Sequence, residues 1–99
     1  MKKFILGTFT CRPGTRDAFI AASLPYAQAT REEEGCIFFE LSAKPDDPDV
    51  ALLMECFVSD DAHKLHHTLP HFKALIAELQ KVMVSSDVTY HFADELLRE

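Results

Sequence analysis

The feature that most constrains the fold is the order in which strand-like blocks alternate with segments of helical periodicity. Four short apolar blocks are bounded by turn residues, as is typical of strands: 4–11, 36–41, 50–58 and 88–92. Apolar residues spaced three or four apart instead fill 15–34 and 70–84, which predicts two helices. The order β-α-β-β-α-β predicts an α+β fold of the ferredoxin-like kind with one antiparallel sheet.

Turn residues set the expected boundaries of these elements. Gly35 is expected to supply a left-handed stop after the first helix, and a short helix is expected over 59–67, capped by Ser59 or Asp60. Ser85-Ser86 is expected to end the last helix before the final strand. A chain of 99 residues without repeat or linker is expected to form one domain over 1–99.

The strands carry large apolar residues next to one another instead of alternating with polar ones. Phe38 and Phe39 are adjacent, and the blocks 4–6 and 52–54 repeat the pattern. Since neighbouring residues of a strand point to opposite faces, both faces of the sheet require burial. The helices cover one face, and a second copy of the chain is the simplest cover for the other. We therefore predict a homodimer with facing sheets; the alternative is a monomer with a large exposed apolar patch.

Charge and hydropathy exclude two classes of partner. The chain has 16 acidic and 10 basic residues, a net charge of −6, and no cluster of Lys and Arg that could follow a phosphate backbone. No apolar run is long enough to span a membrane, and the N-terminal run ends at Thr8, too short for a signal peptide. We expect a cytoplasmic protein that binds neither nucleic acid nor membrane.

The cysteine count is odd, with each residue in or beside an apolar run: Cys11, Cys36 and Cys56. This pattern is typical of buried free thiols in a reducing compartment. A cross-strand bridge between Cys36 and Cys56 is the alternative.

Four histidines fall within nine positions after the third strand: His63, His66, His67 and His71. His63 and His67 are one helical turn apart, so a metal site is one interpretation, although no His-Glu-x-x-His signature accompanies them. A second interpretation places these two at the surface or at helix ends. A third makes His66 and His71 pocket residues, because a neutral imidazole accepts a proton near pH 7.

Glu55 follows the unbroken apolar run 50–54. A glutamate at a strand end most often faces solvent or pairs with a lysine, but after such a run it can also face inward with a raised pKa. The large aromatic residues of the chain are core residues or walls of a pocket.

These segments resemble the antibiotic biosynthesis monooxygenase family. In that family an acid-x-aromatic step ends the third strand, and a His-x-x-x-x-His-Phe step bridges the next two helices. Here Glu55-Cys56-Phe57 is similar to the first and the segment 66–72 to the second. The spacing from Pro13-Gly14 through Glu34-Gly35 to these motifs is also similar, so the resemblance covers nearly the whole chain. It implies a dimeric α/β barrel.

The resemblance also narrows the expected chemistry. The family includes cofactor-independent monooxygenases of quinols or polycyclic phenols, haem-degrading enzymes and an isomerase of a signalling sugar phosphate. The haem-degrading members use an Asn–Trp–His set, whereas this chain contains no Asn and no Trp, and Phe57 stands where Trp is usual. The resemblance therefore implies an oxygenase without cofactor or metal.

The leading hypothesis is a small monooxygenase that oxidises a quinol or phenolic substrate with O2. In this hypothesis His66 is the catalytic base, and His71 or Glu55 orients it. Four aromatic residues are expected to contact the substrate ring: Phe57, Phe72, Phe39 and Tyr90. The alternatives are a non-catalytic dimeric barrel that binds an apolar small molecule, and an isomerase of the same superfamily.

Overall fold

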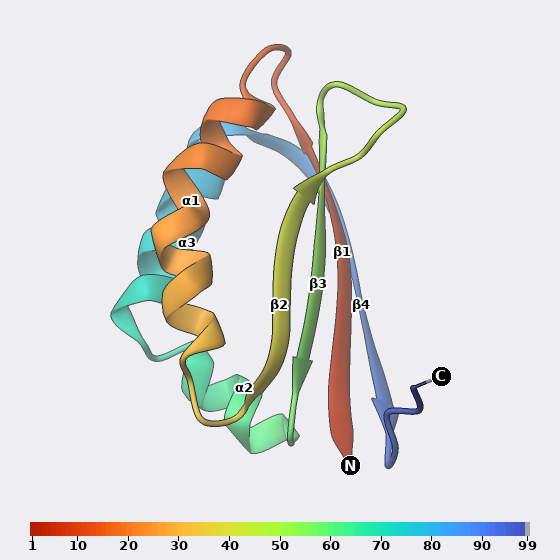
Figure 1. The fold of residues 1–99 in the computed structure, drawn as a ribbon. Coiled ribbons are helices and arrows are strands. Elements are labelled where there is room, and N and C mark those ends of the chain that lie inside the picture. Colours follow the sequence, from red (N-terminus) through yellow and green to blue (C-terminus); the bar gives the residue numbers. More distant parts are fainter. Residues whose placement is uncertain (99) are drawn as a thin grey trace.

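The computed structural model describes residues 1–98 and contains a four-stranded sheet and three helices (Figure 1). The elements in chain order are β1 (Lys2–Cys11), α1 (Arg16–Arg31), β2 (Cys36–Ala43), β3 (Val50–Phe57), α2 (Asp60–His66), α3 (Pro70–Val82) and β4 (Met83–Ala93). Neighbouring strands are antiparallel in the order β2-β3-β1-β4, and the sheet is open. The predicted α+β, ferredoxin-like fold is confirmed.

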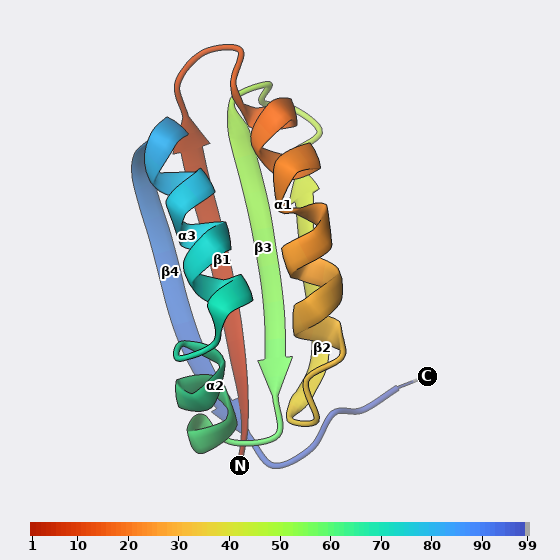
Figure 2. The same cartoon turned by 90° about the vertical axis from the view of Figure 1, so that its left-hand side faces the viewer.

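One face of the sheet is covered by helices. Figure 2 shows α1 and α3 side by side over this face, with α2 at the end of the sheet where β1 begins. Side chains alternate along the strands, and the inward set of both layers forms the core: Phe9, Cys11, Phe19, Ala27, Phe39, Ala51, Leu75 and Leu79. Any site enclosed between sheet and helices is therefore bordered by these apolar residues.

No helix of the described residues lies over the other face of the sheet (Figure 1), and large apolar side chains are exposed on it. Leu6 of β1 and Met54 of β3 pair across this face, and each is about half exposed. They line a hollow of about 280 Å³ whose floor also includes Leu52 and Thr8. Adjacent apolar residues of a strand thus lie on opposite faces of the sheet, as the strand pattern predicts. That a second copy of the chain covers this open face remains a prediction.

β4 begins directly after α3, five residues earlier than the sequence indicates. The expectation that Ser85-Ser86 separates helix from strand is wrong, because both residues pair with β1 opposite Thr10 and Phe9. Pairing of an edge strand depends on backbone groups, so polar side chains do not interrupt it.

Gly35 lies where there is no room for a side chain between the turn after α1 and helix α2. Among the described residues a positive φ occurs at Gly14 (78°), so the predicted left-handed stop at Gly35 is wrong, and α1 ends earlier, at Arg31. A Cβ atom on Gly35 would lie 2.6 Å from the Cβ of Ala62 in α2, far inside van der Waals contact. The glycine therefore lets the turn after α1 approach α2 closely.

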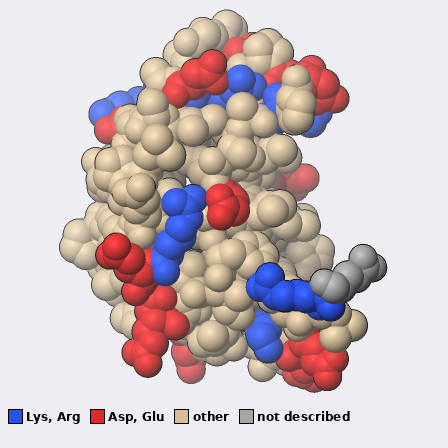
Figure 3. Space-filling model, in the orientation of Figure 1, with Lys and Arg blue, Asp and Glu red and all other residues tan. Residues whose placement is uncertain are grey.

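Charged side chains of both signs are interspersed on the face seen in Figure 3, and basic groups form no continuous surface there. No helix within residues 1–98 has the length and apolar character needed to cross a membrane. Cys11, Cys36 and Cys56 are free thiols, and burial raises the pKa of each.

Candidate active site

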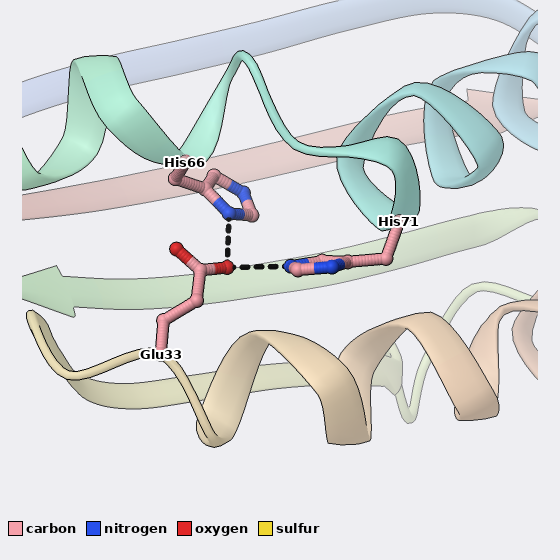
Figure 4. Close-up of side chains that lie close together, drawn as sticks. All are labelled: Glu33, His66 and His71. Atoms are coloured by element: carbon pink, nitrogen blue, oxygen red, sulfur yellow. Dashed lines mark hydrogen bonds and ion pairs between the residues drawn. The ribbon is translucent and has the colours of Figure 1, made fainter.

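Glu33 lies in the turn between α1 and β2, and its carboxylate bridges the imidazole rings of two histidines. Its Oε2 atom lies 2.7 Å from Nδ1 of His66 and 2.6 Å from Nε2 of His71 (Figure 4). The three side chains come from the turn, from the last residue of α2 and from the first turn of α3. The Glu33 side chain is 12% exposed and that of His66 only 3%, so these hydrogen bonds are largely shielded from water.

The local sequence explains why two histidines from different helices converge. Ser59 begins α2 by accepting a backbone hydrogen bond at its hydroxyl oxygen, which confirms one of the two predicted caps. The helix ends at His66, and a short turn over 67–69 leads to Pro70, which suits the first position of α3. His71 is therefore held in the first turn of α3, facing the same carboxylate as His66.

The surroundings of His66 favour its neutral form with the proton on Nδ1. Burial lowers the pKa of His66, and the hydrogen bond and charge of Glu33 oppose this shift only in part. Because Nδ1 faces the carboxylate of Glu33, that nitrogen is the N–H donor. The other ring nitrogen, Nε2, then carries the lone pair and lies 3.7 Å from Oε1 of Glu55.

Glu55 faces inward from β3, as one of the two interpretations of its position predicts. The side chain is buried, with 5% of the residue exposed. Burial, and secondarily the charge of Glu33, raise its pKa to about 7, while Lys3 acts in the opposite direction. At neutral pH the carboxyl group therefore exchanges between its acid and its carboxylate.

A small cavity lies between the sheet and α3, and both His66 and Glu55 reach its wall. Its volume is about 40 Å³, and the rest of its lining is apolar: Phe9, Phe39, Leu41, Leu53, Phe72, Leu75, Ile76 and Leu79. A cavity that holds benzene measures about 150 Å³. This cavity must therefore widen before it can admit an aromatic ring.

The predicted aromatic residues lie in three different places. Phe39 and Phe72 line the cavity, and the Phe72 ring stands edge-on to His66 at 5.0 Å between centroids. Phe57 is fully buried and packs against His66 at 5.1 Å, outside the residues that line the cavity. Tyr90 is 55% exposed on β4, where its ring contacts His63 and lies beneath the Lys3 ammonium.

The structure also separates the remaining histidines. His67 is exposed, as one prediction has it, but His63 is buried beside Phe57, and burial lowers its pKa to about 4. The convergent metal-capable atoms within residues 1–98 are those of Glu33, His66 and His71, which all lie within 4.8 Å of one another. The pair that helical spacing indicates, His63 and His67, is not part of this cluster.

Glu33 is the site residue that the sequence analysis missed. It stands between Glu32 and Glu34 in an acidic run typical of a solvated helix end. One signal distinguishes it: the buried positions of α1 end at Ala27 and Thr30, and the same spacing, continued by three residues, reaches Glu33.

Comparisons with known proteins agree on the family and the fold. A family model described as "Antibiotic biosynthesis monooxygenase" matches residues 4–78, and no curated protein matches the chain in sequence. A solved Caulobacter crescentus protein, provisionally named an antibiotic biosynthesis monooxygenase, is 25% identical, with a TM-score of 0.86 over 95% of this chain and 91% of that one. Rv0793 from Mycobacterium tuberculosis is also 25% identical, with a TM-score of 0.82 over 100% and 98%. A Nitrosomonas europaea protein with the same provisional name has 15% identity and a TM-score of 0.87 over 93% and 89%, which shows a shared fold.

Proposed function

The chain belongs to the antibiotic biosynthesis monooxygenase family, and on that premise we propose that it oxidises a phenol or quinol with O2 without a resident metal, haem or flavin. His66 is the proposed base, Glu33 orients it, and Glu55 lies next to the reacting proton. His71 supports Glu33 through the second hydrogen bond to the same oxygen.

The observation that carries this proposal is the direction of the two His66 nitrogens. Nδ1 is held by Glu33, and Nε2 faces Glu55 at the wall of an apolar cavity. A lone pair at Nε2 can take the proton of a bound phenol, and the carboxylate of Glu33 stabilises the imidazolium that results, as the acid of a catalytic triad does. A general base of this kind contributes about 10²–10⁴ in rate.

The proposed reaction balances without another reactant. His66 removes the phenolic proton, and the phenolate passes one electron to O2, which forms a phenoxyl radical and superoxide. The two radicals combine at a ring carbon that bears hydrogen, and the new peroxide takes the proton from His66. Loss of that carbon's hydrogen with cleavage of the O–O bond then releases water and leaves a quinone. The phenol is oxidised by four electrons, and O2 is reduced by four.

The walls of the cavity favour an aromatic substrate over a phosphorylated one. Phe39 and Phe72 offer ring contacts, and no Lys or Arg is among the lining residues. A sugar phosphate would bring negative charge next to Glu33 and Glu55, and the cavity lining offers no Lys or Arg to receive it, so this arrangement does not favour the isomerase. Binding of a ring requires the cavity to widen, because its volume of about 40 Å³ is smaller than the roughly 150 Å³ that holds benzene.

The protein is proposed to act as a cytoplasmic homodimer. The open face of the sheet exposes Leu6 and Met54 around a hollow of about 280 Å³, which a second sheet would cover. The small molecule and O2 are then its proposed partners, bound on the opposite, helical side of each sheet.

Oxygen consumption with a panel of phenols and quinols tests the proposal. The parent protein is expected to consume O2 and, with ¹⁸O2, to place one label in the quinone and one in water. A redox-inert aromatic analogue, measured by thermal shift, separates binding from turnover. Stabilisation by the analogue without O2 consumption by any substrate would favour the non-catalytic binding protein.

A further inference from the structure

We propose that Glu33, His66 and His71 also form a binding site for a divalent transition-metal cation such as Zn²⁺, and that an ion bound there inactivates the site. The inhibitory effect rests on the proposed function, whereas the binding of the ion does not.

The donor set and its geometry fit such an ion. One carboxylate oxygen and two imidazole nitrogens are a common protein set for Zn²⁺ and other first-row cations. A cation with bonds of about 2.1 Å holds its ligand atoms roughly 3.0–3.4 Å apart. The two N···O distances of 2.7 and 2.6 Å must therefore lengthen by about half an ångström. The two imidazole nitrogens, which lie within 4.8 Å of each other, must come to the same separation.

The surroundings of the cluster supply the other two features of a metal site. The side chain of His71 is 20% exposed, which gives an ion a path from solvent and leaves room for water as a further ligand. On the buried side, Glu55 lies 3.7 Å from the Nε2 atom of His66. Metal-bound histidines usually donate their other N–H to a carboxylate, so Glu55 is placed to accept this proton once the two groups approach to hydrogen-bond distance.

An ion at the cluster and a base at His66 exclude each other. The ion needs the lone pair of Nδ1, so the proton of the neutral ring must move to Nε2. That proton then points toward Glu55, and the nitrogen that would accept a phenolic proton has no free lone pair. Occupancy by Zn²⁺ is thus expected to stop proton transfer without blocking the apolar part of the cavity.

Calorimetric titration of chelator-treated protein with Zn²⁺ alone tests the site, with Co²⁺ absorption as a second readout. The parent is expected to bind one ion per chain. Glu33→Gln and His71→Ala are each expected to lower the affinity by at least about tenfold, since each removes one of three ligands. His91→Ala is the matched control, because His91 is an exposed histidine on β4 that bonds to Thr89.

The outcomes separate a built site from adventitious binding. The inference is overturned if the parent binds no ion, if His91→Ala abolishes binding, or if either cluster variant that keeps its native circular dichroism loses less than tenfold. Should one variant fail to fold, the other decides. Slower O2 consumption at saturating Zn²⁺ tests the inhibition separately, so a protein that binds Zn²⁺ but oxidises no phenol refutes the proposed function and leaves the site intact.

Discussion

Replacing the carboxyl group of Glu55 by an amide measures directly what its burial costs the fold. The pKa of this group rises from 4.5 to about 7 on folding, and each tenfold increase in proton affinity corresponds to about 1.4 kcal/mol. The group therefore makes the parent about 3 kcal/mol more stable in acid than in alkali. The folded protein holds the proton more tightly than the unfolded chain does, so this stability is complete below pH 4.5 and is lost as the pH rises through about 7.

Glu55→Gln cannot ionise and should not show this loss. Urea unfolding of parent and variant in the presence of a chelator, at about pH 4 and about pH 8, gives the free energy of unfolding at each pH. We expect the variant to gain about 3 kcal/mol relative to the parent between the two. Glu34→Gln makes the same chemical change at an exposed position of the turn after α1 and should produce no comparable pH-dependent difference. If the Glu55→Gln and parent curves stay parallel, the buried, proton-sharing environment assigned to Glu55 is wrong.

Further predictions concern the open face and the turn at Gly35. The parent should have the mass of a dimer in light scattering, and Met54→Lys should be a folded monomer. Leu24→Lys, a change at a similarly exposed residue of α1, should remain dimeric. A monomeric parent would refute the dimer with facing sheets. Gly35→Ala should lower the free energy of unfolding by about 1–3 kcal/mol, because its Cβ would lie 2.6 Å from that of Ala62. Ala62→Gly alone should cost about 1 kcal/mol, because glycine weakens a helix. The double variant should be little less stable than Ala62→Gly alone, because the clash at Gly35→Ala is then removed. If the free-energy losses of the two single variants simply add, the contact with Ala62 is not the cause.

Hydrophobic periodicity predicts helices and strands well where buried positions carry apolar side chains and exposed positions carry polar ones. The stripe of α3 contains Leu75 and Leu79 in the core, and the apolar blocks correctly located four strands. The start of β4 was missed because Ser85 and Ser86 belong to an edge strand held by backbone pairing with β1. No local pattern reports such pairing.

The site was predictable only in part, because its central residue is defined by tertiary contacts. The helix-bridging motif indicated His66 and His71, and the apolar run before Glu55 indicated that it could face inward. Glu33 is a site residue because the turn after α1 lies close to α2 and α3. This close approach is possible because Gly35 has no side chain. A run of three glutamates in the sequence does not indicate it. Tyr90 was predicted to contact the substrate, but the structure places it outside the cavity. Its pairing with Ile5 directs its side chain to the helical side of the sheet, where it remains exposed.

The most direct test of the account is the rate of O2 consumption by His66→Ala beside His67→Ala with the same phenol. His66→Ala is expected to lose about 10²–10⁴ in rate, because the lost group is the proposed general base. His67→Ala should be nearly silent, because this neighbour is exposed and lies outside the Glu33 cluster. Full O2 consumption by a folded His66→Ala protein would contradict the assignment of His66 as the base.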